Sequence, residues 1–275
     1  MGNKSTQIQT LFFQAKQTHT SLFFPYICLG YPSFEKSLEI AETALTHGAH
    51  GLEIGVPFSD PIADGPVLQR ANFYSLQKGT RPQDAFRFMK ILRSRGFQQP
   101  LLLMSYANPM EHLGWKVVAQ GLSKVQAQGI IVPDWPLSQI PPIQNIFKPY
   151  QLKVIPFLSP TSDVHRQKQV DALQAPFLYY VSVTGVTGAR KSISKNLIFQ
   201  LRRLNQSMKT PIGVGFGIST PQQAQRIGQV AQGIIIASAL IELIEKASAG
   251  QIVPIVKDFC RKISVAIQKS PVERI

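Results

Sequence analysis

The sequence contains few cysteines and histidines, and both scarcities argue against disulfide or metal sites. Only two of the 275 residues are cysteines, and Cys28 and Cys260 lie too far apart for the usual spacings of a disulfide framework or a thiolate site. The five histidines give no ligand pattern, because His47 and His50 lie where a predicted helix ends before a strand. We therefore expect no metal, and a reducing compartment such as the cytoplasm.

The sequence also lacks long apolar runs. The longest, Gly233 to Ile241, is well short of the roughly 20 residues that a membrane-spanning helix needs. No apolar segment follows Lys4 near the N-terminus, so we expect no secretory signal. These absences again favour a cytoplasmic protein.

Acidic residues are scarce relative to basic ones. The chain has 29 Lys and Arg against 15 Asp and Glu, a net charge of +14, which favours anionic partners such as phosphate esters, nucleic acid or acidic proteins. The basic residues are scattered, and no module of interleaved aromatic and basic residues appears, so nucleic acid is not predicted. Because 44% of the residues are hydrophobic and 16% are charged, a large core is predicted and disorder is not.

Short apolar runs rich in β-branched residues alternate with amphipathic segments. Eight strands are predicted at 23–29, 51–55, 100–105, 129–132, 152–156, 177–182, 212–216 and 233–236. The intervening helices include 33–46, 82–94, one that begins at Thr220-Pro221, and 252–267.

Eight strand–helix units predict an α/β fold, a parallel (β/α)8 TIM barrel formed by residues 1–275 as one domain. The alternative is a doubly wound open sheet. Its dinucleotide signature is missing, because the chain reads Gly30-Tyr31-Pro32-Ser33 after the first strand.

The stretch "LEIGVPFSDPIADGP" (52–66) places carboxyl groups at the carboxyl end of the second strand. Glu53 lies between two apolar residues inside the strand, where burying a carboxyl group is costly unless it is needed. Asp60 and Asp64 follow in a loop stiffened by three prolines, and such a loop can hold acids toward the barrel mouth. The other interpretation is that Asp60 and Asp64 cap the next helix, which we favour for Asp60.

Two further regions follow strands at the same barrel end. "VSVTGVTGAR" (181–190) is either a lid or phosphate loop or an ordinary connection, and composition alone leaves both open. "GVGFGIS" (213–219) and "IIIASAL" (234–240) follow the last two strands, where many barrels bind phosphate with glycine and a helix N-terminus. Gly217 and Ser238 are the candidate residues there.

These segments together resemble the tryptophan synthase alpha chain family. The resemblance is carried by fourteen consecutive residues from Leu52 to Gly65 and by "SYANPM", "PDWP", "GVTGAR" and "GFGIS", in the family's order over nearly the whole chain. It implies a TIM barrel that cleaves indole-3-glycerol phosphate to indole and glyceraldehyde 3-phosphate, late in tryptophan biosynthesis. It also implies an α2β2 complex in which pyridoxal phosphate belongs to the beta chain and this chain uses no cofactor.

The resemblance also implies roles for individual residues. Glu53 matches the acid–base glutamate, and Asp64 matches the aspartate that accepts the indole N–H. Other substrate-binding positions are Tyr179, Thr187 (a lid threonine expected to reach Asp64), Gly188, Phe216, Gly217, Ala237 and Ser238. Positions that match the surface facing the beta chain are Tyr106, Asn108 and Asp134.

Three residues depart from the pattern of that family. Ala237 stands where the family mostly has glycine, Cys28 where small or hydroxyl residues are usual, and Trp135 where a smaller aliphatic residue is usual. These departures leave a second hypothesis open, a weakly active or non-catalytic activator of the beta chain. A Schiff-base aldolase is disfavoured, because the only lysine in a predicted strand, Lys153, lies at the wrong end of its strand.

Overall fold

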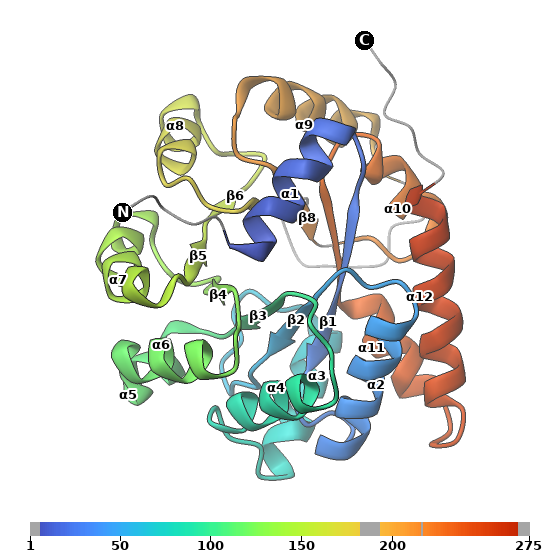
Figure 1. Ribbon diagram of the computed structural model, residues 1–275. Coiled ribbons are helices and arrows are strands. Elements are labelled where there is room, and N and C mark those ends of the chain that lie inside the picture. Colours follow the sequence, from blue (N-terminus) through green and yellow to red (C-terminus); the bar gives the residue numbers. More distant parts are fainter. Residues whose placement is uncertain (1–5, 182–192, 216, 269–275) are drawn as a thin grey trace.

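The computed structural model describes residues 6–181, 193–215 and 217–268. Parallel strands form a nearly closed barrel inside a ring of helices (Figure 1). The strands are β1 (Leu22–Cys28), β2 (Leu52–Gly55), β3 (Leu101–Met104), β4 (Gly129–Ile131), β5 (Lys153–Ile155), β6 (Phe157–Leu158), β7 (Leu178–Val181), β8 (Ile212–Gly215) and β9 (Gly233–Ile236).

Helices connect successive strands and cover the outside of the barrel. They are α1 (Gln7–Thr18), α2 (Phe34–Thr46), α3 (Pro66–Gln77), α4 (Asp84–Ser94), α5 (Ala107–Leu113), α6 (Trp115–Lys124), α7 (Ile140–Phe147), α8 (Val164–Ala172), α9 (Lys195–Ser207), α10 (Pro221–Gly228), α11 (Ser238–Lys246) and α12 (Ile252–Gln268). In the described ranges, no helix is both long and apolar enough to cross a membrane.

The predicted fifth strand is divided in two by a proline. The strand order runs β5-β4-β3-β2-β1-β9-β8-β7-β6, so β5 and β6 stand at its two ends although only Pro156 separates them in the chain. Proline has no N–H for the ladder, but the Pro156 carbonyl still accepts from Tyr179 N at 2.8 Å. The nine segments therefore make the predicted eight-stranded barrel, and the TIM-barrel prediction is confirmed.

Side chains alternate between an outer and an inner core along each strand. Phe23 and Ile27 of β1 pack outward against the helices, whereas Phe24, Tyr26 and Cys28 pack inside the barrel. This two-residue period is the ordinary consequence of strand geometry, and it decides which residues of every strand face the interior.

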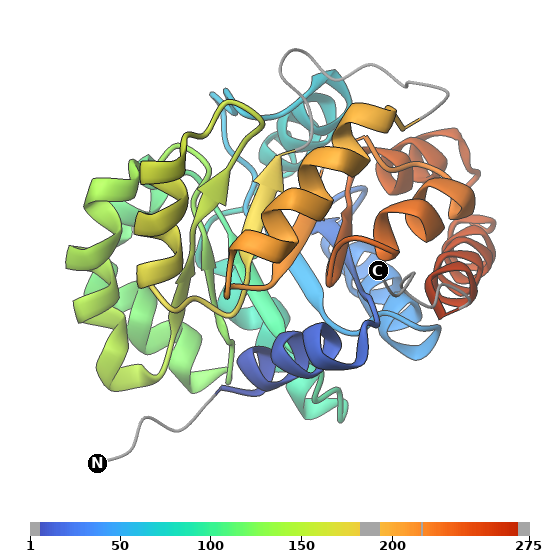
Figure 2. The same ribbon diagram turned by 90° about the horizontal axis from the view of Figure 1, so that it is seen from above.

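Helix α1 closes the end of the barrel where the strands begin. The ring of Phe12 is fully buried and stacks on Phe177, just before β7, with centroids 4.3 Å apart. At Gly233, the first residue of β9, a Cβ atom would come within 2.6 Å of the Phe12 ring, so this glycine makes room for the ring. Figure 2 shows α1 lying across one end of the strands.

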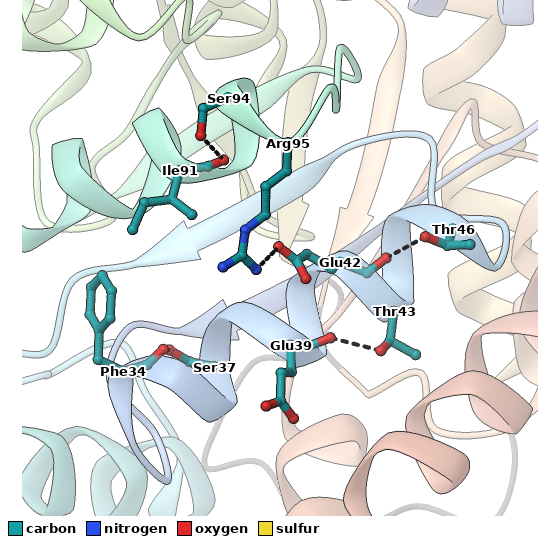
Figure 3. Close-up of polar contacts among 9 residues, drawn as sticks. All are labelled: Phe34, Ser37, Glu39, Glu42, Thr43, Thr46, Ile91, Ser94 and Arg95. Carbon is teal, nitrogen blue, oxygen red and sulfur yellow. Dashed lines mark hydrogen bonds and ion pairs between the residues drawn. The ribbon is translucent and has the colours of Figure 1, made fainter.

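Exposed ion pairs link neighbouring helices on the outside. Arg95, which follows α4, reaches Glu42 of α2 at 2.5 Å, and hydroxyl groups such as Thr43 bond carbonyls within their own helices (Figure 3). Exposed pairs of this kind contribute little to stability. The two apolar layers are what hold the barrel together.

Candidate active site

A cavity opens at the carboxyl end of the strands, where TIM barrels carry their active sites. Every strand of the barrel, or the loop after it, contributes to its lining. The side chains that reach the cavity include Tyr26, Glu53, Asp64, Leu68, Met104, Ile131, Phe157, Tyr179, Ile235, Ala237 and Ser238. The floor is apolar, so an aromatic ring could be held there.

Glu53 lies inside the barrel, which explains an acid in a core strand. Its neighbours in register are Tyr26 of β1 and Leu102 of β3, both in the inner core. The side chain is 3% exposed, and its Oε2 has no hydrogen-bond partner in the described part of the chain. An unpaired carboxyl oxygen aimed into a cavity is available to a ligand.

The protonation of Glu53 follows from this position. Burial, and next the charge of Asp64, raise the pKa of Glu53 to about 8, while a hydrogen bond from the Tyr179 hydroxyl lowers it. Near neutral pH Glu53 is mostly protonated, as a proton donor needs to be.

Asp64 is more deeply held than its loop position suggested. It is 8% exposed, its Oδ2 accepts from Asn72 Nδ2 at 3.0 Å, and the Tyr106 hydroxyl also bonds to it. Burial raises the pKa of Asp64 to about 6, and hydrogen bonds from the Asn72 and Tyr106 side chains limit the rise. Asp64 is still mostly ionised at pH 7.

The prediction that Asp60 caps the following helix is wrong. Helix α3 begins after Gly65 with Pro66 in its first turn and has no side-chain cap. Asp60 instead accepts from the neighbouring Ser59 hydroxyl at 2.5 Å on the exposed side of the loop. The rigid Pro61 separates it from the end of the loop, and Asp64 alone of the two reaches the cavity.

Tyr179 and Tyr26 fill the inside of the barrel on either side of Glu53, and each needs a glycine beside it. A Cβ on Gly215 would lie 2.3 Å from the Tyr179 ring, and one on Gly55 would lie 2.0 Å from the Tyr26 hydroxyl. Tyr179 also stacks on Phe157, with ring centroids 4.9 Å apart. These contacts fix the tyrosine rings at the wall of the cavity.

The opposite wall offers backbone groups rather than acids. Gly217 has a φ of +77°, a backbone conformation that residues other than glycine rarely adopt. It lines the cavity together with Ala237 and Ser238. Ala237 precedes α11, whose N-terminus has no side-chain cap, whereas α10 is closed by a capping box of Thr220 and Gln223. The N-terminus of α11 therefore faces the cavity with donors suited to an anion.

We call the hydrogen-bonded group of Glu53, Asp64, Asn72, Tyr106 and Tyr179 the acid side, of which Glu53, Asp64 and Tyr179 line the cavity. We call the wall of Gly217, Ala237 and Ser238 the anion side. Three expected substrate-binding residues, Thr187, Gly188 and Phe216, lie outside the described residues. No group of three or more potential metal ligands occurs within the described ranges.

The residues expected at a partner surface are placed differently from one another. Asn108 is exposed, and Asp134 is partly buried and accepts from Ala107 N at 2.9 Å, at the start of α5. The side chain of Tyr106 is only 1% exposed, and its hydroxyl accepts from Ala63 N at 3.1 Å beside Asp64. Its side chain therefore belongs to the acid side, which corrects its assignment to a surface.

Sequence reasoning missed Tyr26, Phe157 and Asn72. Tyr26 could have been found, because it lies beside Glu53 on the neighbouring strand and the two-residue period of β1 turns its side chain to the same inner face. Asn72 contacts Asp64 from the next helix, eight positions later, and no local pattern marks that contact.

Fold and site define a class: a (β/α)8-barrel enzyme with two carboxyl groups of different pKa over an apolar floor and an uncapped helix N-terminus at its rim. A family model described as tryptophan synthase alpha chain matches residues 12–267. The chain belongs to the tryptophan synthase alpha chain family, which confirms the resemblance found in the sequence. It is accordingly a lyase that carries out the alpha reaction in tryptophan biosynthesis.

Individual relatives agree over almost the full length. The tryptophan synthase alpha chain of Roseiflexus castenholzii is 35% identical over 256 residues, which are 93% of this chain and 98% of that protein. Tryptophan synthase subunit alpha from Legionella pneumophila has a TM-score of 0.88 at 29% identity, covering 96% of this chain and 98% of the other. A Mycobacterium tuberculosis tryptophan synthase chain gives 0.85 at 25% identity, covering 96% and 99%.

Proposed function

We propose that Glu53 and Asp64 carry out the retro-aldol cleavage of indole-3-glycerol phosphate to indole and glyceraldehyde 3-phosphate. The observation that supports this most directly is their opposite protonation in one cavity: Glu53 with a pKa of about 8 and Asp64 with a pKa of about 6. Near pH 7 one is mainly an acid and the other mainly an anion.

The steps follow from those states. Protonated Glu53 gives its proton to C3 of the indole ring, and the positive charge that develops on the ring nitrogen is stabilised by ionised Asp64, which accepts the N–H. The Glu53 carboxylate then takes the proton of the side-chain hydroxyl next to the ring. The carbon–carbon bond breaks, its electrons return to the ring, and the hydroxyl carbon becomes the aldehyde. Glu53 ends protonated, as it began.

The anion side would hold the phosphate. The uncapped start of α11 and the backbone around Gly217 supply N–H donors, and a helix N-terminus favours negative charge. Phosphate held at the rim would place the ring over the apolar floor formed by residues such as Met104 and Ile235. Thr187, Gly188 and Phe216 remain predicted members of this site.

We further propose a cytoplasmic beta-chain partner that carries pyridoxal phosphate, with no cofactor on this chain, in an α2β2 assembly. The family name supports a beta partner, and the similar Mycobacterium structure is described as tryptophan synthase. Asn108 and Asp134 are the accessible residues predicted to face it.

The test is direct turnover of indole-3-glycerol phosphate by the purified chain, alone and with the beta chain. The wild type is expected to release indole, and Glu53→Gln, which has a similar shape but cannot exchange the proton, is expected to lose most of that activity while still folding and binding the beta chain. Wild-type-like turnover by Glu53→Gln would contradict the role of Glu53. No product from the wild type even in the complex would instead favour the activator hypothesis.

A further inference from the structure

Asn72 of α3 is a buried amide that the mechanism above does not use. It is 2% exposed, and its two ends bond to different elements. Nδ2 donates to Asp64 Oδ2 at 3.0 Å, and Oδ1 accepts from the Cys28 thiol at 3.8 Å. A thiol at the end of β1, an amide on α3 and a carboxyl group after β2 therefore form one hydrogen-bonded chain.

The neighbours of Asn72 fix which end of the amide faces the acid. Burial raises the pKa of Cys28, so its sulfur keeps a proton and can donate. Ionised Asp64 can only accept. Both neighbours select the same orientation, with the amide nitrogen toward the carboxylate, and the alternative flip would set oxygen against oxygen.

We propose that Asn72 is a positioning residue that holds the Asp64 carboxylate toward the cavity as an acceptor, and that Cys28 keeps Asn72 in the orientation this requires. The inference rests on the role proposed for Asp64. The other interpretation is that Asn72 only ties α3 to the loop before it, as Gln69 does through a 2.8 Å bond from its Nε2 to the Asp64 carbonyl.

The two interpretations differ in what happens to the titration of Asp64. In the described part of the chain, the titratable groups around Asp64 come from four neighbouring elements: Glu53 on β2, Tyr26 and Cys28 on β1, Tyr106 before α5, and Tyr179 on β7. Glu242 of α11 also lines the cavity. Burial raises the pKa of the four phenol and thiol groups well above this range, whereas the pKa of Glu53, raised to about 8, lies within the pH 5 to 9 window in which Asp64 is followed.

Removing the amide donor takes away a bond that favours the ionised form of Asp64. A hydrogen bond to a charged group is worth enough to move a pKa by about one to two units. The pKa of Asp64 is therefore expected to rise from about 6, and the acid limb of kcat/KM to move to higher pH by the same amount. A purely structural tie would lower stability without moving this limb.

The experiment compares Asn72→Leu with the wild type as full-length chains in complex with the beta chain, from pH 5 to 9. Ser75→Ala is the matched control, because Ser75 is also fully buried on α3 and bonds the Leu29 carbonyl rather than Asp64. The acid limb should move up by about one to two units in Asn72→Leu and stay in place in Ser75→Ala. Cys28→Val should move it in the same direction by less.

A second measurement does not depend on turnover. Carbon-13 NMR of the side-chain carboxyl groups follows the titration of Asp64 in the full chain without substrate. An unchanged Asp64 titration in Asn72→Leu would overturn the inference, whatever its activity. A wild type without lyase activity would instead overturn the proposed function, and the NMR shift would still decide the role of Asn72. Should Asn72→Leu not fold, Asn72→Ala, which also has no side-chain donor, answers the same question.

Discussion

On the acid side of the cavity polar side chains hydrogen-bond to one another, whereas on the anion side the start of a helix lines the cavity without a side-chain cap. Asp64 accepts hydrogen bonds from Asn72 and Tyr106, and Glu53 accepts one from the Tyr179 hydroxyl. Across the cavity, the first turn of α11 has no side-chain cap and Gly217 adopts a positive φ. The carboxyl groups that we expect to exchange protons or stabilise positive charge are held in place by other side chains. The donors that we expect to bind an anion are supplied by the main chain.

The difference has a physical reason. A buried carboxyl group has a pKa that depends steeply on its donors and neighbours, so its surroundings must be specified atom by atom. A phosphate needs several N–H donors and positive potential but tolerates small displacements, which a helix end provides without charged side chains. Changes on the acid side should therefore alter kcat and its pH dependence, whereas changes on the anion side should alter KM.

The largest expected effect comes from breaking the acid side at Asp64. Asp64→Asn keeps the shape but removes the charge that stabilises the ring cation, so kcat should fall by roughly 10²- to 10³-fold, with little change in KM. Because the charge of Asp64 also raises the pKa of Glu53, the pKa of Glu53 should fall below about 8 in this variant. Steady-state kinetics and carboxyl NMR measure the two effects, and a rise in KM alone would place Asp64 outside the chemistry.

An intermediate effect is expected from adding charge to the anion side. Ala237→Asp puts a carboxylate beside the start of α11, where it competes with the substrate phosphate, so KM should rise about tenfold or more, as a loss of about 1.4 kcal/mol of binding implies. The same charge should favour the helix by about 0.3–1 kcal/mol, so thermal stability should not fall. Ala237→Gly is the control, because it removes the methyl group without adding charge and should bind phosphate at least as well as the wild type. Equal KM values in all three proteins would remove Ala237 from the anion site.

The smallest effect concerns stability and sharpens the contrast between the two carboxyl groups. The folded-state pKa of Glu53 is raised from 4.5 to about 8, so the stability given by its protonated form is fully present below about pH 4.5 and is lost as pH rises through about 8. Glu53→Gln does not titrate, so its melting temperature should exceed that of the wild type by an amount that grows across this window and then levels off. Melting curves at several pH values test this, and a difference independent of pH would mean that burial does not shift this group.

Sequence reasoning reached the barrel because its signals were local and repeated. Each strand was an apolar run, and the boundaries of Gly233–Ile236 were predicted to the residue. The division of the fifth strand was not predicted, because Pro156 ended that prediction and left Phe157 and Leu158 unassigned. The two-residue strand that they form depends on pairing with Tyr179 and Tyr180, which lie far along the chain.

The active-site residues were predicted only where the sequence carried a local signal. Glu53 could be found from its position between apolar residues, and Asp64 lay in a loop of unusual composition. The burial of Asp64 could not be foreseen, since its cover comes from Asn72 and Tyr106 on other elements. The cap predicted for Asp60 failed because Pro66 already starts α3 without one. The roles of Thr187, Gly188 and Phe216 stay predictions.

Phe12, at the closed end of the barrel, has a consequence for how substrate enters and products leave the enzyme. With Phe12 of α1 packed against Phe177 and Phe24, aromatic rings close the chamber at the end where the strands begin, so substrate and products pass at the end where the strands finish. The aromatic part of the proposed substrate would be seated deepest and its phosphate nearest the rim. A plug at one end thus confines both entry and departure to the other.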